Sequence, residues 1–377
     1  MAYKIPLFDL NYGTAEEEAV LKVLRSKWIS MGPQVQQLEE AFSANLSVKN
    51  SVAVSNCTAA LHLALKVLGI GKGDEVIVPS LTFVATANVV RYVDATPVFA
   101  DITSLKDYSI DPADIEKKIT PQTKVIIVMH YGGFSCDMDA IRHLAKQHNL
   151  YIVEDAAHAP YAEYKGEKLG TIGDIGCFSF FSNKNITCAE GGMLVTNNDN
   201  FAEKAKLLRA HGMTTLSFDR AKGHSTRYDV LDSGYNYRLD DIRGALALSQ
   251  LKKLKADIEK RKELRGIYLE KLGTLDEIIL PYKNFKYESS NYIFPILLKD
   301  GNAQKRDFFR EELKNRGIQT SIHYPAVHLF SVYKDFCVPL PKTEYVTANE
   351  ITLPLYFSLK PQDINYIATE ISKIAIN

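Results

Sequence analysis

Between Ser55 and about Asn200, helical patterns alternate regularly with short apolar runs, and this alternation restricts the possible folds more than any other feature of the sequence. The runs are rich in β-branched residues, which is typical of buried strands, and they read EVIVP, TPVFAD, KVIIVMH, LYIVED, GCFSFF and GMLVTN. Between two of them, Met138, Ile141 and Leu144 recur at helical spacing. Repeated βα units predict an α/β fold with a mostly parallel sheet and helices on both of its faces.

Outside this region the sequence predicts further helices and a second, smaller domain. Amphipathic patterns predict helices at residues 16–28, 33–45 and 238–272. Later patterns predict a strand at 292–298, a helix at 308–317, a strand at 318–323 and a helix at 363–375. We therefore expect a large domain over residues 1–250, which includes the N-terminal helices, and a small C-terminal α+β domain over residues 251–377.

The charge balance and the absence of special segments exclude several classes of partner. Lysine plus arginine and aspartate plus glutamate both number 45, so no field of one sign would attract nucleic acid or an anionic membrane. No apolar run is long enough to span a bilayer, and the first residues do not have the pattern of a secretory signal. The five cysteines form no CxxC pair that would indicate a metal site. We expect a cytoplasmic protein that binds small molecules and no metal.

A first candidate site lies where the strand-like SVAV meets the helical stripe of Leu61, Leu65 and Leu68. The residues at this junction are Ser55-Asn56-Cys57-Thr58, so polar side chains occupy a helix start. Free backbone amides and the positive end of the helix dipole favour an anion such as a phosphate there. An ordinary helix cap is the alternative interpretation.

A second candidate site is YIVEDAAHAP, a strand-like run that ends in Glu154 and Asp155 and is followed by His158. Ligands collect at the carboxyl ends of strands in an open parallel sheet. A carboxylate at that edge can hold a protonated ring nitrogen through a charge-assisted hydrogen bond. A helix-capping role for Asp155 and a core position for His158 are the alternatives.

The third segment, GCFSFFSNKNITCAEGGM, places Lys184 in a loop between two apolar stretches. Apolar surroundings disfavour the charged form of a lysine, so its amine becomes available to attack a carbonyl and form a Schiff base. Gly191 and Gly192 would allow the backbone to turn tightly beneath a flat ring. This segment favours a catalytic lysine over a solvating one.

Together these segments resemble the DegT group of fold-type I aminotransferases, which mostly aminate keto sugars bound to nucleotides. The resemblance covers nearly the whole chain. The matching stretches are KWISMGPQVQQLEEAF, SVAVSNCTAALHLAL, GDEVIVPSLTFVATANVV, YIVEDAAHA, GCFSFFSNKNITCAEGGM and GYNYRLDDIRGALALSQL. The resemblance implies pyridoxal 5'-phosphate as the cofactor, which becomes pyridoxamine 5'-phosphate during turnover.

The resemblance also implies roles for residues of the three segments. Lys184 resembles the Schiff-base lysine and proton shuttle, and Asp155 resembles the partner of the pyridinium nitrogen. Phe83 matches the aromatic residue that stacks on the cofactor, with core packing as its alternative. His158 matches a polar residue near the hydroxyl of the ring.

The phosphate of the cofactor has its own set of matching positions, which are Thr58, Ser179 and the backbone around Cys57. Asn236 resembles an asparagine that reaches the phosphate from the neighbouring subunit, which implies a homodimer with shared active sites. A surface turn is the alternative for Asn236, although Tyr235 and Tyr237 on either side make it less favoured.

Two positions depart from the family pattern. Cys57 replaces the usual glycine before Thr58, and Ala189 replaces the first glycine of the usual GEGG. Neither change removes a catalytic side chain. We expect both residues to tune the site.

The implied reaction is a ping-pong transamination in which an amino acid, expected to be glutamate, donates its amine and a keto sugar, expected to be nucleotide-linked, accepts it. A small phosphorylated ketone or a ketose phosphate is the alternative acceptor. Candidate substrate contacts by position are Trp28, Ser30, Met31, His323, Tyr324 and His328, with core or surface roles as alternatives. A sugar dehydratase would replace the lysine, and a regulatory relative would lose Lys184 or Asp155, so both classes are less favoured.

Overall fold

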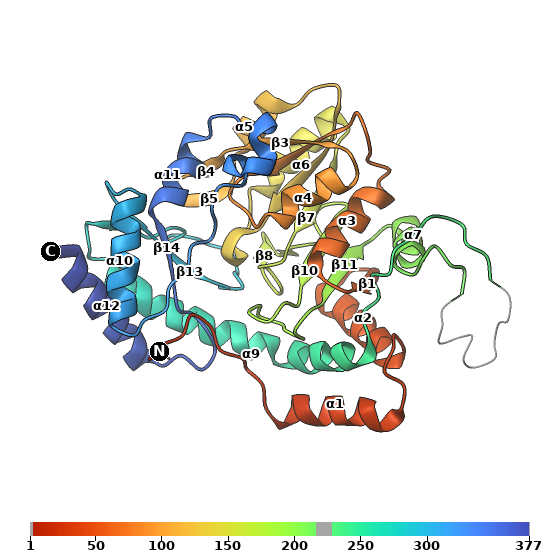
Figure 1. Cartoon of the computed structure of the whole chain (residues 1–377), viewed down its shortest axis with the longest axis horizontal. Coiled ribbons are helices and arrows are strands. Elements are labelled where there is room, and N and C mark those ends of the chain that lie inside the picture. The colour runs from red at the N-terminus through yellow and green to blue at the C-terminus, as the bar shows by residue number, and fades with distance from the viewer. Residues whose placement is uncertain (1–2, 216–227, 377) are drawn as a thin grey trace.

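A seven-stranded sheet forms the centre of the large part of the chain in this computed structural model, which describes residues 3–215 and 228–376 (Figure 1). The strand order is β1-β11-β10-β7-β6-β2-β3. Strand β11 runs antiparallel to both of its neighbours, and the remaining neighbours are parallel, so the expected mostly parallel sheet is confirmed. The strands are β1 (Asn50–Val54), β2 (Glu75–Pro79), β3 (Thr96–Ala100), β6 (Thr123–Met129), β7 (Tyr151–Asp155), β10 (Ile175–Ser179) and β11 (Gly192–Thr196).

Helices cover both faces of this sheet, because successive strand residues point to opposite sides. In β2, Ile77 belongs to the core on one face, and Val76 and Val78 belong to the core on the other. The helices on the Ile77 face are α2 (Pro33–Leu46), α5 (Pro112–Lys118) and α6 (Met138–His148). Those on the opposite face are α3 (Cys57–Val67), α4 (Ala85–Tyr92) and α7 (Asp199–Arg209). The expected α/β architecture is confirmed.

The C-terminal part forms a second core around a three-stranded antiparallel sheet of β12 (Ile278–Ile279), β13 (Phe294–Leu298) and β14 (Glu350–Leu353). Its helices are α10 (Ala303–Asn315), α11 (Pro341–Asn349) and α12 (Pro361–Ile376). The prediction of a strand at residues 318–323 is wrong. This segment makes only isolated bridges, from Ile318 to Ile5 and from Ser321 to Thr352, because the chain leaves the sheet there, and β14 pairs with β13.

Helix α9 (Asp241–Leu272) joins the two parts, and α1 (Thr14–Ser26) packs along its outer side (Figure 1). The expected domain boundary near residue 250 falls inside this continuous helix. Leu254 and Ile258 belong to the core of the large sheet, whereas Leu264 and Tyr268 belong to the C-terminal core.

The remaining short elements are β4 (Ile102–Ser104), β5 (Asp107–Ile110), β8 (Glu163–Tyr164), β9 (Glu167–Lys168) and the 3₁₀ turns η1 (Tyr131–Gly133), η2 (Val327–Leu329) and η3 (Ser331–Phe336). Within the described ranges, none of the helices combines the length and the apolar character that crossing a bilayer requires.

Candidate active site

A cavity of about 370 Å³ lies where β6, β7 and β10 end, at the carboxyl edge of the sheet. Nine of the fourteen candidate site residues line it, although they come from widely separated parts of the chain. They are Cys57, Thr58, Phe83, Asp155, His158, Ser179, Lys184, His323 and Tyr324. This edge is where an open α/β sheet places its ligands.

The N-terminus of α3 forms one wall of the cavity and is fitted to an anion. Asn56 caps the helix, because its Oδ1 accepts a hydrogen bond from the amide of Ala59 at 2.8 Å. Cys57 and Thr58 occupy the first turn, where backbone amides have no partner within the helix. The helix dipole and these amides suit a phosphate group, with the Thr58 hydroxyl as a further donor.

Gly192 permits the close packing that places this helix end. A Cβ at Gly192 would lie 2.5 Å from the carbonyl carbon of Asn56 and 2.7 Å from the amide nitrogen of Cys57. Gly192 is also held in the sheet, opposite Val54 on one side and Ser179 on the other. The glycine therefore serves the approach of β11 to α3, and the position with a positive φ is instead Ala189, at 70°.

Asp155 is a buried carboxylate that lacks a full counter-charge. Its Oδ2 accepts a hydrogen bond from the Thr86 hydroxyl at 2.7 Å, and its Oδ1 accepts one from the amide of Ala157 at 3.2 Å. Burial raises the pKa of Asp155 above its usual value despite these bonds and the nearby Lys184. A protonated ring nitrogen would supply the missing positive charge, so the residue fits the expected cofactor.

Lys184 is partly buried, and its ammonium nitrogen lies 4.2 Å from the centroid of the Tyr292 ring. Burial lowers the pKa of Lys184 to about 8, and the negative charge of Asp155 opposes this shift without cancelling it. About a tenth of the amine is therefore uncharged at pH 7, far more than for a lysine with the usual pKa. This is the state that attacks a carbonyl carbon.

His158 is fully buried in the wall of the cavity and has both ring nitrogens engaged. Its Nδ1 accepts a hydrogen bond from the amide of Gly132 at 3.2 Å, and its Nε2 lies 2.9 Å from the hydroxyl of Tyr324. Burial, and then the charge of Lys184, hold the pKa of His158 well below its usual value. The neutral ring therefore carries its proton on Nε2 and donates it to Tyr324.

Phe83 is 56% exposed, which is unusual for a phenylalanine, and it lines the cavity. Its ring centroid lies 5.9 Å from that of Tyr324. The core-packing alternative for Phe83 does not fit this exposure. Its open face is available to a flat ring within the cavity.

Five predicted residues do not line this cavity. His328 is buried elsewhere, with Nδ1 2.6 Å from the Ser80 hydroxyl and Nε2 3.3 Å from Glu344, so it is not free to contact a substrate here. The side chain of Asn236 is exposed, contrary to the expectation from its aromatic neighbours. Trp28, Ser30 and Met31 lie in the turn between α1 and α2.

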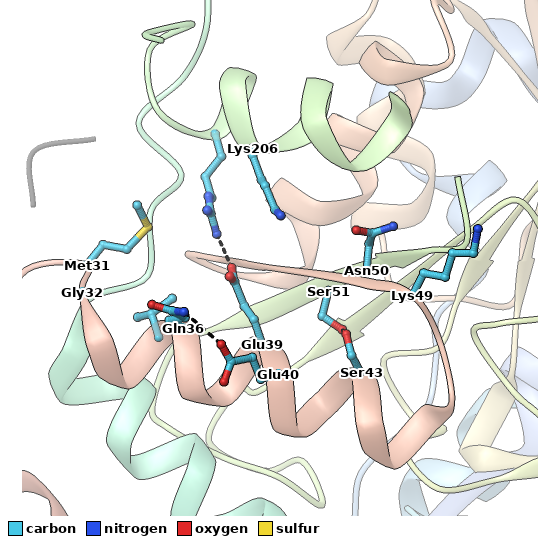
Figure 2. Close-up of a pocket in the computed structure, with 12 residues that line it drawn as sticks. Met31, Gly32, Gln36, Glu39, Glu40, Ser43, Lys49, Asn50, Ser51 and Lys206 are labelled. Atoms are coloured by element: carbon cyan, nitrogen blue, oxygen red, sulfur yellow. Dashed lines mark hydrogen bonds and ion pairs between the residues drawn. The ribbon is translucent and has the colours of Figure 1, made fainter. Parts of the chain in front are cut away.

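Met31 instead borders a second cavity of about 660 Å³ between α2, β1 and α7, which Figure 2 shows in close-up. This cavity shares no lining residue with the first one. Arg209 is its most deeply buried cation, and that side chain is paired with Glu39 at 2.5 Å and with the carbonyl of Ala53 at 2.7 Å. The two lysines that line the larger cavity, Lys49 and Lys206, are exposed, and neither of its carboxylates, Glu39 and Glu40, is fully buried.

Sequence reasoning missed two residues that shape the site, Thr86 and Tyr292. Thr86 belongs to the matching stretch GDEVIVPSLTFVATANVV, and a polar residue on the buried side of a short apolar helix could have indicated it. Tyr292 stands at the start of the strand predicted at residues 292–298, and no local pattern relates it to Lys184. Among the residues that the structure describes, no three His, Cys, Asp or Glu side chains group around a possible metal position.

The fold and this combination of a helix end, a buried carboxylate and a partly uncharged lysine define a fold-type I, pyridoxal-phosphate-dependent aminotransferase. Residues 11–372 match the DegT/DnrJ/EryC1/StrS aminotransferase family, and the chain belongs to this family.

Known proteins resemble the chain over its full length. It is 38% identical to the spore coat polysaccharide biosynthesis protein SpsC of Bacillus subtilis, over 99% of this chain and 97% of that protein. Its fold matches PseC of Helicobacter pylori, an aminotransferase involved in the biosynthesis of pseudoaminic acid, with a TM-score of 0.92, 32% identity and 100% coverage of both chains. It also matches the pyridoxamine-phosphate form of the putative sugar aminotransferase Spr1654 of Streptococcus pneumoniae, with a TM-score of 0.92, 30% identity and 100% and 99% coverage.

Proposed function

We propose that the chain transfers an amino group from L-glutamate to a keto sugar that is linked to a nucleotide, by a ping-pong reaction. The observation that carries this proposal is the shared cavity of Lys184, Asp155 and the N-terminus of α3. The similar proteins support a sugar acceptor, because Spr1654 is a putative sugar aminotransferase and SpsC is a polysaccharide biosynthesis protein.

Each group of the cavity has a distinct part in this reaction. The α3 N-terminus, Thr58 and Ser179 bind the cofactor phosphate, and Phe83 orients the ring. Asp155 holds the proton on the ring nitrogen. Pyridoxal phosphate, when bound, supplies an electron-withdrawing ring that stabilises negative charge on a substrate carbon.

Lys184 is the residue that we assign to covalent attachment and to proton transfer. Its Nζ takes a proton from the α-carbon of the amino donor and delivers one to the carbon that receives the amine. The lowered pKa of Lys184, about 8, lets the amine act as a base near neutral pH. His158 orients Tyr324 through the 2.9 Å hydrogen bond.

The functional unit in this proposal is a homodimer in which Asn236 contacts the cofactor phosphate of the partner. Asn236 is exposed and does not line the cavity of its own chain. Both features are expected of a residue that contacts the cofactor of a second copy. Nearby Tyr228, Val230 and Leu231 are each more than half exposed, and apolar side chains of this kind are covered in an interface.

The test is to record the visible spectrum of the purified holoenzyme and to add glutamate. We expect glutamate to remove the absorption band of the lysine-bound cofactor. An acceptor ketone added afterwards should restore this band. A nucleotide-linked keto sugar and a ketose phosphate should be compared as acceptors, because faster recovery with the ketose phosphate would favour the alternative substrate. A holoenzyme whose band does not respond to glutamate or to any other amino acid would overturn the proposal.

The attachment site is tested separately. Borohydride should fix the cofactor to the wild-type chain and not to Lys184→Ala. Lys146→Ala, at an exposed position of α6, is the matched control and should label like the wild type. Labelling of Lys184→Ala would show that another lysine holds the cofactor.

A further inference from the structure

His323 is anchored on one side by β14 and borders the candidate active site on the other. Its ring Nδ1 lies 2.9 Å from the hydroxyl oxygen of Thr352, and its backbone amide donates to Glu350 Oε2 at 2.8 Å. The side chain is 7% exposed and lines the same cavity as Lys184. The ring is therefore fixed, and only its protonation pattern can vary.

Thr352 links this ring to Glu350. Its hydroxyl oxygen lies 2.5 Å from Glu350 Oε1, and both Thr352 and Glu350 are fully buried. A hydroxyl has a single hydrogen, so Thr352 donates to one neighbour and accepts from the other. Among the residues that the structure describes, the ring of His323 makes its hydrogen bond through Nδ1, so Nε2 remains for a ligand in the cavity.

The chain of bonds has two self-consistent arrangements. When Glu350 is ionised, Thr352 donates to Glu350 and accepts the Nδ1 proton of His323, which leaves Nε2 as a bare acceptor. When Glu350 is protonated on Oε1, it donates to Thr352, Thr352 donates to Nδ1, and Nε2 carries the proton. Glu350 Oε2 accepts from the amide of His323 in both arrangements.

We propose that Glu350, acting through Thr352, determines which ring nitrogen of His323 carries the proton, so that the cavity receives an N–H donor from Nε2 when Glu350 is protonated. The group it serves is an oxygen atom of the bound substrate, such as a carboxylate or a carbonyl. This assignment rests on the aminotransferase function proposed above. Glu350 is thus a positioning residue that does not touch the substrate.

The surroundings favour the arrangement with a donor at neutral pH. Burial raises the pKa of Glu350 to about 8, because no cation in the described part of the chain pairs with it directly. The positive charges of Arg310 and Arg306 on α10 oppose this shift from a distance. The other groups that face Glu350 are His323 and the hydroxyls of Tyr108, Tyr131 and Tyr324. Burial also lowers the pKa of His323 to about 3, so its ring stays neutral in both arrangements.

The direct test is ¹⁵N NMR of histidine-labelled protein without cofactor, with His323→Gln to assign the signals. The proton of His323 should reside on Nε2 at pH 7 and move to Nδ1 at pH 9. Glu350→Gln should keep it on Nε2 at both pH values, because an amide donates to Thr352 at every pH. A ring proton that stays on one nitrogen in the wild type at both pH values would overturn the proposal.

Thr352 offers a matched pair of variants. Thr352→Ser keeps the hydroxyl and should keep the pH-dependent change, whereas Thr352→Val has almost the shape of threonine and should abolish it. A change that persists in Thr352→Val would show that the protons do not pass through this residue.

The functional readout is the half-reaction of the holoenzyme with glutamate at pH 7 and pH 9. Titration near pH 8 predicts that the ratio of the wild-type rate to the Glu350→Gln rate falls about tenfold between these values. A constant ratio would overturn the role of the donor. If no variant and no wild-type protein reacts with glutamate, the proposed function fails, while the NMR result still decides the proton position.

Discussion

Gly192→Ala is the substitution whose consequence the structure defines most closely. The new Cβ would lie 2.5 to 2.7 Å from three backbone atoms of Asn56 and Cys57, whereas contacts of this kind are normally at least 3.4 Å. Strand β11 cannot retreat, because Gly192 is paired with Val54 on one side and Ser179 on the other. The N-terminus of α3 must therefore shift by roughly 1 Å, which is a form of overpacking.

A shift of the α3 N-terminus by that distance should weaken cofactor binding. Overpacking costs about 1–3 kcal/mol of stability, and the loss of one hydrogen bond to a charged group costs about 1.5–3 kcal/mol. If one amide of the α3 N-terminus loses its contact with the phosphate, the affinity for pyridoxal phosphate falls by about 10- to 100-fold. Titration of the cofactor-free protein, followed through the visible band, measures this change.

The matched control is Gly266→Ala, in the C-terminal part of α9. A Cβ there meets nothing within 4 Å, so the control should stabilise the helix by up to about 1 kcal/mol and leave cofactor affinity unchanged. Urea unfolding of both variants separates folding from binding. A folded Gly192→Ala protein with wild-type cofactor affinity would refute the reasoning.

Two further substitutions and one pH titration test the site. Thr86→Val removes the hydroxyl that bonds Asp155 at 2.7 Å, which costs the carboxylate about 1.5–3 kcal/mol, so the glutamate half-reaction in stopped flow should slow at least tenfold while Thr86→Ser stays close to wild type. An unchanged rate in Thr86→Val would contradict this role. Ala189→Gly relieves an alanine at φ 70° and should raise the unfolding free energy in urea by about 0.5–1 kcal/mol, after the entropy of glycine is subtracted. Equal stability would show that Ala189 is unstrained. Because burial lowers the pKa of Lys184 to about 8, its uncharged fraction grows as pH rises to that value, so cofactor attachment followed by absorbance should accelerate up to about pH 8 and then level off. Acceleration that continues beyond pH 10 would place the lysine pKa at its usual value.

The large sheet could be predicted from the sequence because its strands are buried on both faces. Runs such as KVIIVMH show no polar alternation, and glycine, proline and asparagine residues mark their ends. Asp155 follows directly from this pattern, since the last residue of a parallel strand faces the ligand edge, whereas Ser179 was predicted only from the family resemblance. Lys184 could be singled out because a lysine between apolar stretches is unusual.

The C-terminal part was harder to predict, because its strands are short and their partners are distant in sequence. Residues 318–323 have the composition of a strand, but Ile318 pairs with Ile5 and Ser321 pairs with Thr352, so no continuous ladder forms. His328 follows His323 by only five residues, yet it turns to Ser80 and leaves the cavity. The pairing of residues 318–323 and the orientation of His328 depend on long-range hydrogen bonds, which local periodicity does not encode.

The residues that line the cavity come from two kinds of element, strand ends and a loop, and this difference indicates which residues determine acceptor specificity. Asp155 and Ser179 sit on strand ends that the sheet fixes, and they face the expected cofactor. Tyr324 belongs to a loop of the C-terminal part, where Thr347 donates to its carbonyl at 3.0 Å and His158 holds its hydroxyl at 2.9 Å. Loops tolerate substitution better than buried strands, so changes around Tyr324 can alter the acceptor while the cofactor contacts persist. Acceptor choice should therefore be sought first in the segment that carries His323 and Tyr324.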